Sequence, residues 1–65
     1  MKLFLITNIQ NFDDSTCLNE DELHDYFAER LGVADANRIV EWAAGARRHD
    51  ELDLYPAAPY MIEAR

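Results

Sequence analysis

Residues 18–33, which read LNEDELHDYFAERLGV, contain the strongest local folding signal in the sequence. Asn19 is a favourable helix N-cap, and Glu22 stands three residues later, as in the Asn-x-x-Glu form of a capping box. Leu18 and Leu23 occupy the two positions of a hydrophobic staple, which fixes the direction in which the chain enters a helix. Because these signals agree in register, the stretch predicts a helix that begins directly after Asn19.

The same stretch predicts a helix with one apolar side and one acidic side. At 100° per residue, the large apolar residues cluster on one side, and four carboxylates fall within an arc of about 100° on the other. The apolar set is Leu23, Tyr26, Phe27 and Leu31, and the acidic set is Asp21, Glu22, Asp25 and Glu29. Gly32 should end the helix from the C′ position, with Val33 covering the last turn.

The residues that precede this helix predict a strand and then an ordered loop. Residues 3–7 (LFLIT) are β-prone and apolar on both faces, which is typical of a strand with neighbours on both sides. Residues 8–16 are polar and rich in turn formers, so we expect them to form a loop. This loop would carry Asp13 and Asp14 and support the acidic side of the helix.

The residues that follow the helix predict a second helix and two further strands. A helix that begins near Asp35 places Ile39 and Trp42 on one apolar face. Residues 51–55 alternate polar and apolar side chains, as a half-buried strand does, and residues 60–64 are also β-prone. The two prolines between these segments require a turn there.

Together these elements predict an α+β fold, with residues 1–65 as a single domain. The expected architecture is a short two- or three-stranded antiparallel sheet with two helices packed on one face. The single cysteine, Cys17, excludes an intrachain disulfide, so either the apolar core packs efficiently or a partner completes it. The expected core residues are Leu3, Leu5, Phe27, Leu31, Ile39, Trp42 and Ile62.

The charge of the chain is strongly negative and unevenly distributed. Thirteen acidic residues against six basic ones give a net charge of −7. Residues 1–29 contain seven of the acids and one base, so the excess gathers in the first half of the chain. Such a patch repels nucleic acid and anionic membranes and attracts basic surfaces, although a purely solubilising surface has the same composition.

Catalytic and cofactor-binding patterns are absent from the sequence. Cys17 and the hydroxyl residues before it are candidate nucleophiles, but no nucleophile elbow accompanies them and the chain has only two glycines. His24 lies beside Asp21 and Asp25, but helical geometry turns it away from them, which makes a poor metal site. We therefore expect a protein that is not an enzyme and needs no cofactor or metal.

The opening apolar run is too short for a targeting or membrane-spanning segment. Residues 3–6 are the only consecutive apolar residues there, whereas the apolar region of a signal peptide needs about 7–15 residues. The sequence therefore predicts a protein of the cytoplasm that does not engage a membrane.

Residues 27–33 (FAERLGV) resemble the first helix and turn of the Cro/repressor family of helix-turn-helix proteins. Trp42 resembles a residue of that family's recognition helix, but it falls one position later than the family pattern places it. Arg38 stands where the family has an apolar anchor, and Ala34 and Asp35 replace the usual Ser and Gln. This resemblance implies a DNA-binding regulator, an alternative that the net charge of −7 opposes because duplex binding relies on phosphate neutralisation.

In its size, acidity and order of elements, the whole chain resembles small phage-encoded anti-CRISPR proteins that act on type I systems, with type I-C among them. The opening residues, MKLFLITN, are similar to those of small phage products. The resemblance implies a non-enzymatic inhibitor in the bacterial host cell that behaves as a DNA mimic. Its acidic face would cover a basic surface on a subunit of a type I CRISPR effector complex (Cascade) and block target-DNA binding. Another small regulatory binder, such as an antitoxin, is a further alternative.

The charge pattern, and not the family resemblance, identifies the residues expected to bind such a partner. Carboxylates on one helix face and in the preceding loop would pair with arginines of a basic protein surface. These candidate partner-binding residues are Asp13, Asp14, Asp21, Glu22, Asp25 and Glu29.

Overall fold

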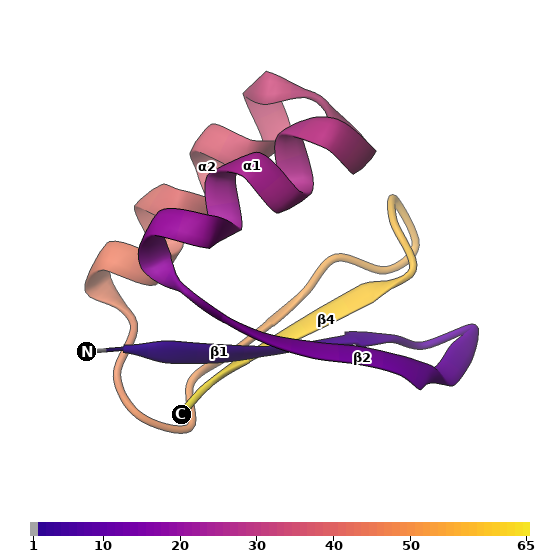
Figure 1. Cartoon of the computed structure of the whole chain (residues 1–65), viewed down its shortest axis with the longest axis horizontal. Coiled ribbons are helices and arrows are strands. Elements are labelled where there is room, and N and C mark those ends of the chain that lie inside the picture. Colours follow the sequence, from indigo (N-terminus) through magenta and orange to yellow (C-terminus); the bar gives the residue numbers. More distant parts are fainter. Residues whose placement is uncertain (1) are drawn as a thin grey trace.

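Two helices lie on one face of an antiparallel sheet in the computed structural model, which describes residues 2–65 with the side chain of Phe12 outside the described part (Figure 1). The elements in chain order are β1 (Leu3–Asn8), β2 (Asn11–Asn19), α1 (Glu20–Leu31), α2 (Val33–Gly45), β3 (Glu51–Asp53) and β4 (Tyr60–Ala64). The predicted α+β class is confirmed. Within the described chain the sheet has four strands, in the order β2-β1-β4-β3, where two or three were expected.

Strand β1 lies inside the sheet, as its apolar character on both faces predicted. It pairs with β2 on one side and with β4 on the other, so the first and last strands of the described chain are direct neighbours. Phe4 lies opposite Ala64, and the Arg65 amide donates to the Leu3 carbonyl at 2.8 Å. β1 and β4 are therefore the two central strands of the sheet.

The face of β1 that enters the core differs from the prediction. Phe4 and Ile6 are buried under the helices, whereas Leu3 is 43% exposed on the opposite face and Leu5 lies outside the core. Every residue from Leu3 to Ile6 is apolar, so alternation along the strand does not distinguish the two faces. The packing of the helices decides between them.

The core consists of residues from both helices and both central strands. Its members are Phe4, Ile6, Leu23, Phe27, Ala36, Ile39, Ala43, Ala46, Ile62 and Ala64. The prediction is confirmed for Phe27, Ile39 and Ile62. Leu31 and Trp42 are only half-buried at its margin, where the Trp42 ring packs on Phe4 with a centroid distance of 5.9 Å.

Strand β2 replaces most of the predicted loop over residues 8–16. Thr16 and Leu18 lie opposite Ile6 and Phe4, and the ladder with β1 becomes irregular only beyond Thr7. The loop prediction was wrong because β1 supplies the hydrogen-bond partners of this polar segment, and such pairing leaves no trace in local composition. Asp13 and Asp14 therefore lie on a strand.

The capping box of α1 is present as predicted. The Glu22 amide donates to Asn19 Oδ1 at 2.9 Å, and the Asn19 amide donates to Glu22 Oε1 at 3.1 Å. Asn19 is also the last residue of β2, which is compatible with capping because an N-cap has extended backbone angles. One residue therefore ends the strand and begins the helix.

We expect Asn19→Ala to lower the free energy of unfolding by about 1 kcal/mol, because it removes the acceptor for the Glu22 amide. Asn19→Asp should be nearly neutral, since a carboxylate caps equally well. Urea unfolding followed by circular dichroism measures both variants. Equal stability of Asn19→Ala and the parent would contradict the capping role.

Gly32 alone separates the two helices. Its φ of 98° is unfavourable for residues with a side chain, and its amide donates to the Ala28 carbonyl at 3.1 Å. Helix α2 begins at Val33, two residues before the expected start near Asp35. Val33 is 59% exposed, so its predicted role in covering the last turn of α1 is wrong.

Candidate protein-binding site

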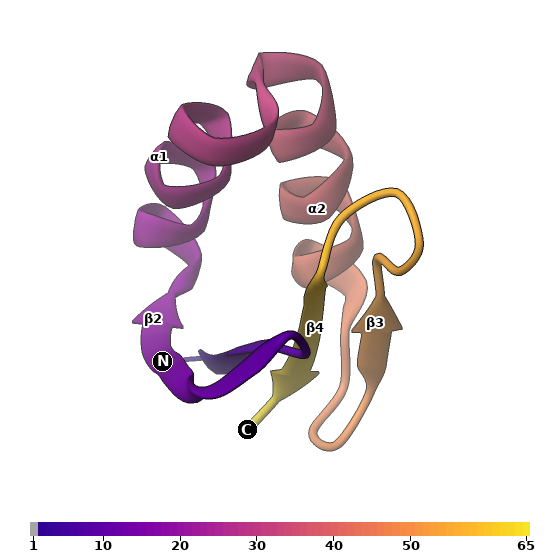
Figure 2. The ribbon, with the colours of Figure 1, turned by 90° about the vertical axis from the view of Figure 1, so that its right-hand side faces the viewer.

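A shallow groove runs between edge strand β2 and helix α1. It has a volume of about 300 Å³ and is lined by Leu18, Glu22, Asp25, Tyr26, Glu29 and Arg30. Figure 2 shows β2 and α1 on one side of the molecule and α2 and β3 on the other. We call this feature the β2–α1 groove. It is where the predicted acidic face of the first helix meets the sheet.

Three of the predicted partner-binding carboxylates border this groove. Glu22, Asp25 and Glu29 are all exposed on α1. The Asp25 side chain is 96% exposed and lies 4.0 Å from the His24 ring, a weak contact at the surface. Among the residues that the structure describes, Glu22 and Glu29 form no ion pair. Asp25 and Glu29 are therefore available to a cationic partner, and Glu22, whose Oε1 accepts the Asn19 amide, offers its second oxygen.

The groove already accommodates one guanidinium group, that of Arg30. The Arg30 guanidinium carbon lies 3.7 Å from the centre of the Tyr26 ring, and its Nη1 donates to the Tyr26 carbonyl at 3.1 Å. Tyr26 is held in turn by edge-to-face contact with Phe27 at 5.0 Å and with Tyr60 at 6.5 Å. The groove thus combines a fixed aromatic ring with exposed carboxylates, a combination that suits arginine side chains.

Burial raises the pKa of the Tyr26 phenol above its ordinary value of 10.0, with smaller contributions from Tyr60 and Asp14, while Arg30 opposes the shift. Since the raised pKa favours the neutral phenol in the folded state, this contribution to stability is present below pH 10 and is lost as the pH rises through the folded pKa.

We therefore expect Tyr26 to ionise at a higher pH than a free tyrosine. Spectrophotometric titration of the parent and of Tyr26→Phe gives the Tyr26 component by difference. Asp14→Asn should lower the pKa of Tyr26, because it removes a negative charge that disfavours the phenolate. A difference titration with a midpoint at or below the ordinary value would contradict the assignment.

The remaining predicted partner-binding residues are more dispersed. Asp13 is exposed on β2, where its amide donates to Asn11 Oδ1 at 3.3 Å. Asp21 lies outside the β2–α1 groove and lines a separate depression with Lys2 and Glu20. The structure thus brings together Glu22, Asp25 and Glu29. Asp14 is exposed on β2, and the groove lining includes none of Asp13, Asp14 and Asp21.

Sequence reasoning missed the uncharged part of the groove. Leu18 was assigned to the hydrophobic staple and Tyr26 to the apolar side of the helix, but both also line the groove. Tyr26 follows directly after the acidic Asp25 in sequence. That position at the boundary between the two helix faces was the available signal.

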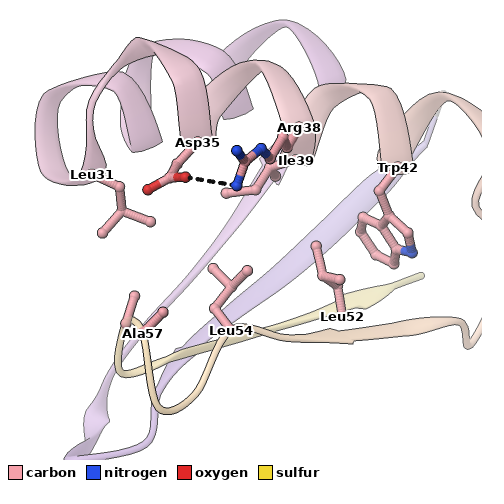
Figure 3. Close-up of a pocket in the computed structure, with 9 residues that line it drawn as sticks. Leu31, Asp35, Arg38, Ile39, Trp42, Leu52, Leu54 and Ala57 are labelled. Atoms are coloured by element: carbon pink, nitrogen blue, oxygen red, sulfur yellow. Dashed lines mark ion pairs between the residues drawn. The ribbon is translucent and has the colours of Figure 1, made fainter.

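A second, more apolar crevice lies between α2 and the β3–β4 hairpin, with a volume of about 270 Å³. Figure 3 shows Leu31, Ile39 and Trp42 on the helices above it and Leu52, Leu54 and Ala57 below. At its rim, Arg38 Nη1 lies 3.7 Å from Asp35 Oδ1. This crevice is remote from the acidic side and contains no predicted partner-binding residue.

The described residues do not gather into a metal-binding cluster of three or more His, Cys, Asp or Glu side chains. His24, the histidine considered from the sequence, instead has its Nε2 atom 2.9 Å from Asn37 Oδ1. Neither helix in the described part of the chain combines the length and apolarity needed to cross a membrane.

The chain was compared with protein-family models, curated proteins and solved structures, and none of the three comparisons found a significant match.

Proposed function

We propose that the protein is a non-enzymatic inhibitor that binds a basic, nucleic-acid-binding surface of another protein through the β2–α1 groove. The observation that carries this proposal is the gathering of three exposed carboxylates of α1 along one groove beside the edge strand β2. Glu22, Asp25 and Glu29 border the groove together with the Tyr26 ring. Because these carboxylates are exposed, pairing with arginines demands little rearrangement of the protein.

The negative charge also supports rapid and selective association. A net charge of −7, with seven of the thirteen acidic residues within residues 1–29, attracts a basic protein surface and repels nucleic acid. A basic channel that holds DNA is such a surface, and an acidic protein seated in it would exclude the duplex as a DNA mimic does. The resemblance to phage anti-CRISPR proteins makes a type I effector complex in the bacterial cytoplasm the partner that we propose.

The experiment is a competition assay with purified type I effector complexes and their labelled target duplexes. We expect the protein to displace the duplex from at least one subtype, with type I-C the first to test, and inhibition to weaken as salt rises. Inhibition that persists unchanged at high salt would contradict an electrostatic surface. If no subtype is inhibited, the proposed target is wrong.

The arrangement of the helices favours this proposal over a helix-turn-helix regulator. Helix-turn-helix units join their helices by a turn of three or four residues. Here Gly32 alone separates α1 from α2, which lie side by side over the sheet (Figures 1 and 2). The charge around the β2–α1 groove also opposes the approach of phosphates.

A further inference from the structure

Strand β2 leaves one edge of the sheet unpaired within the described chain. It has nine residues and a neighbour on one side only, whereas the opposite edge strand, β3, has three residues. Proteins usually protect long edges with charged side chains, proline, a bulge or a covering segment, and in β2 the charges (Asp13 and Asp14) and the irregular pairing lie before residue 15. Residues 15–19 (STCLN) contain neither lysine nor proline. This edge is therefore able to pair with another strand.

The hydrogen bonds of the central strands determine which backbone groups face that edge. The Arg65 amide donates to the Leu3 carbonyl, so the backbone groups of Leu3 point toward β4. Successive residues of a strand point their backbone groups in opposite directions, so those of Phe4 and Ile6 point toward β2. Their partners are Leu18 and Thr16, whose backbone groups therefore point back toward β1.

By the same alternation, the amides and carbonyls of Ser15 and Cys17 point away from the sheet. The Asn19 amide has the same orientation, and it indeed donates to a side chain outside the sheet, Glu22 Oε1, at 3.1 Å. Two independent hydrogen bonds thus lead to one orientation for β2. The backbone groups of Ser15 and Cys17 are therefore free to form the hydrogen bonds of a short antiparallel or parallel ladder with an added strand.

The position of the β2–α1 groove determines the side chains that an added strand would need. A strand paired with β2 lies about 4.8 Å beyond it, and its side chains alternate between the two faces of the sheet. Leu18 faces the helices and lines the groove. Side chains of the added strand that lie beside Thr16 and Leu18 would therefore point toward the groove carboxylates. Basic residues at every second position would therefore face Glu22, Asp25 and Glu29.

We propose that the partner contributes an extended segment, with arginine or lysine at alternate positions, that adds to β2 as a further strand. This inference rests on the proposed basic partner and specifies how part of it is held. Main-chain hydrogen bonds to Ser15 and Cys17 fix the segment, and the groove carboxylates select its charge. A second copy of the chain suits this edge poorly, because each copy would bring a net charge of −7.

The probes that test this inference are two synthetic peptides of equal composition. One alternates arginine with β-prone residues, RTRVRTR, and the other groups the arginines at its ends, RRTVTRR. We expect the alternating peptide to bind more tightly, because all four of its arginines lie on one face of a strand. In the other peptide the arginines are divided between the two faces. Equal affinity of the two peptides would overturn strand addition and leave simple charge attraction.

The matched protein variants are Ser15→Pro and Ser15→Ala. Proline removes an amide that points away from the sheet, a position where edge strands tolerate it, so the fold should remain. We expect Ser15→Pro to weaken binding of the alternating peptide about tenfold and Ser15→Ala to leave it unchanged. The amides of Ser15 and Cys17 should also become protected from hydrogen exchange when the peptide binds.

Further outcomes separate this inference from the proposed function. If Ser15→Pro unfolds, peptides N-methylated at alternate residues test the same hydrogen bonds, and equal binding of both methylation patterns would overturn the inference. Dimerisation of the free protein through β2, seen by sedimentation, would also overturn it. If Ser15→Pro still inhibits the effector complex as the parent does, the acidic surface remains the binding site and strand addition is wrong.

Discussion

Replacing Phe4 with alanine should leave the protein largely unfolded at 25 °C. Phe4 has no exposed surface and packs on the Trp42 ring at 5.9 Å, so truncation loses buried apolar contact and leaves a cavity. Such a change costs about 3–5 kcal/mol. A core of this size rarely supplies more than about 3–5 kcal/mol of stability in total. Circular dichroism and thermal melting measure the loss.

The matched control is the neighbouring residue on the same strand. Leu3 lies on the face opposite the helices and is 43% exposed, so Leu3→Ala should change the free energy of unfolding by about 0.5 kcal/mol or less. Comparison of Phe4→Ala with Leu3→Ala tests which face of β1 is buried. If Leu3→Ala unfolds the protein and Phe4→Ala does not, the opposite face packs against the helices.

Reversing two groove charges should abolish binding to a basic partner. Asp25→Lys and Glu29→Lys together replace two carboxylates with positive charges. These charges would face the partner's arginines, which are also positive. We expect affinity for the effector complex to fall by at least about a hundredfold, because each favourable pair becomes a repulsive one. Both positions are exposed, so the melting curve should barely change.

A second double variant controls for the change in net charge. Glu41→Lys with Glu51→Lys alters the net charge by the same amount, but these exposed residues lie on α2 and β3, away from the groove. Titration of both variants against the effector complex should show a large loss for the groove variant and a small one for the control. Equal losses would mean that overall charge, and not the groove, is responsible for binding.

Helix α1 was predictable because its signals are local. Asn19 and Glu22 form the expected capping box, and Gly32 ends the helix as expected, although as its C-cap and not from the C′ position. The periodicity of the helix was sufficient to gather Glu22, Asp25 and Glu29 on one exposed side. Strand β1 was also predictable as an inner strand, since few other arrangements bury a strand that is apolar on both faces.

The features that sequence reasoning missed depend on distant parts of the chain. Strand β2 was taken for a loop because its hydrogen-bond partners belong to β1, and its polar Asp13 and Asp14 lack the alternation of a half-buried strand. The buried face of β1 could not be chosen because Leu3 and Phe4 are equally apolar. The groove was missed because it depends on contact between two elements and exists only where β2 meets α1.

The pairing of β1 with β4 also determines how the protein responds to force. The two strands are antiparallel neighbours, and the hydrogen bond from Arg65 to Leu3 joins the start of one to the end of the other. Tension applied between these two residues would load the hydrogen bonds of the central ladder one at a time, as in opening a zipper, and not all at once in shear. The fold should therefore resist tension between Leu3 and Arg65 poorly.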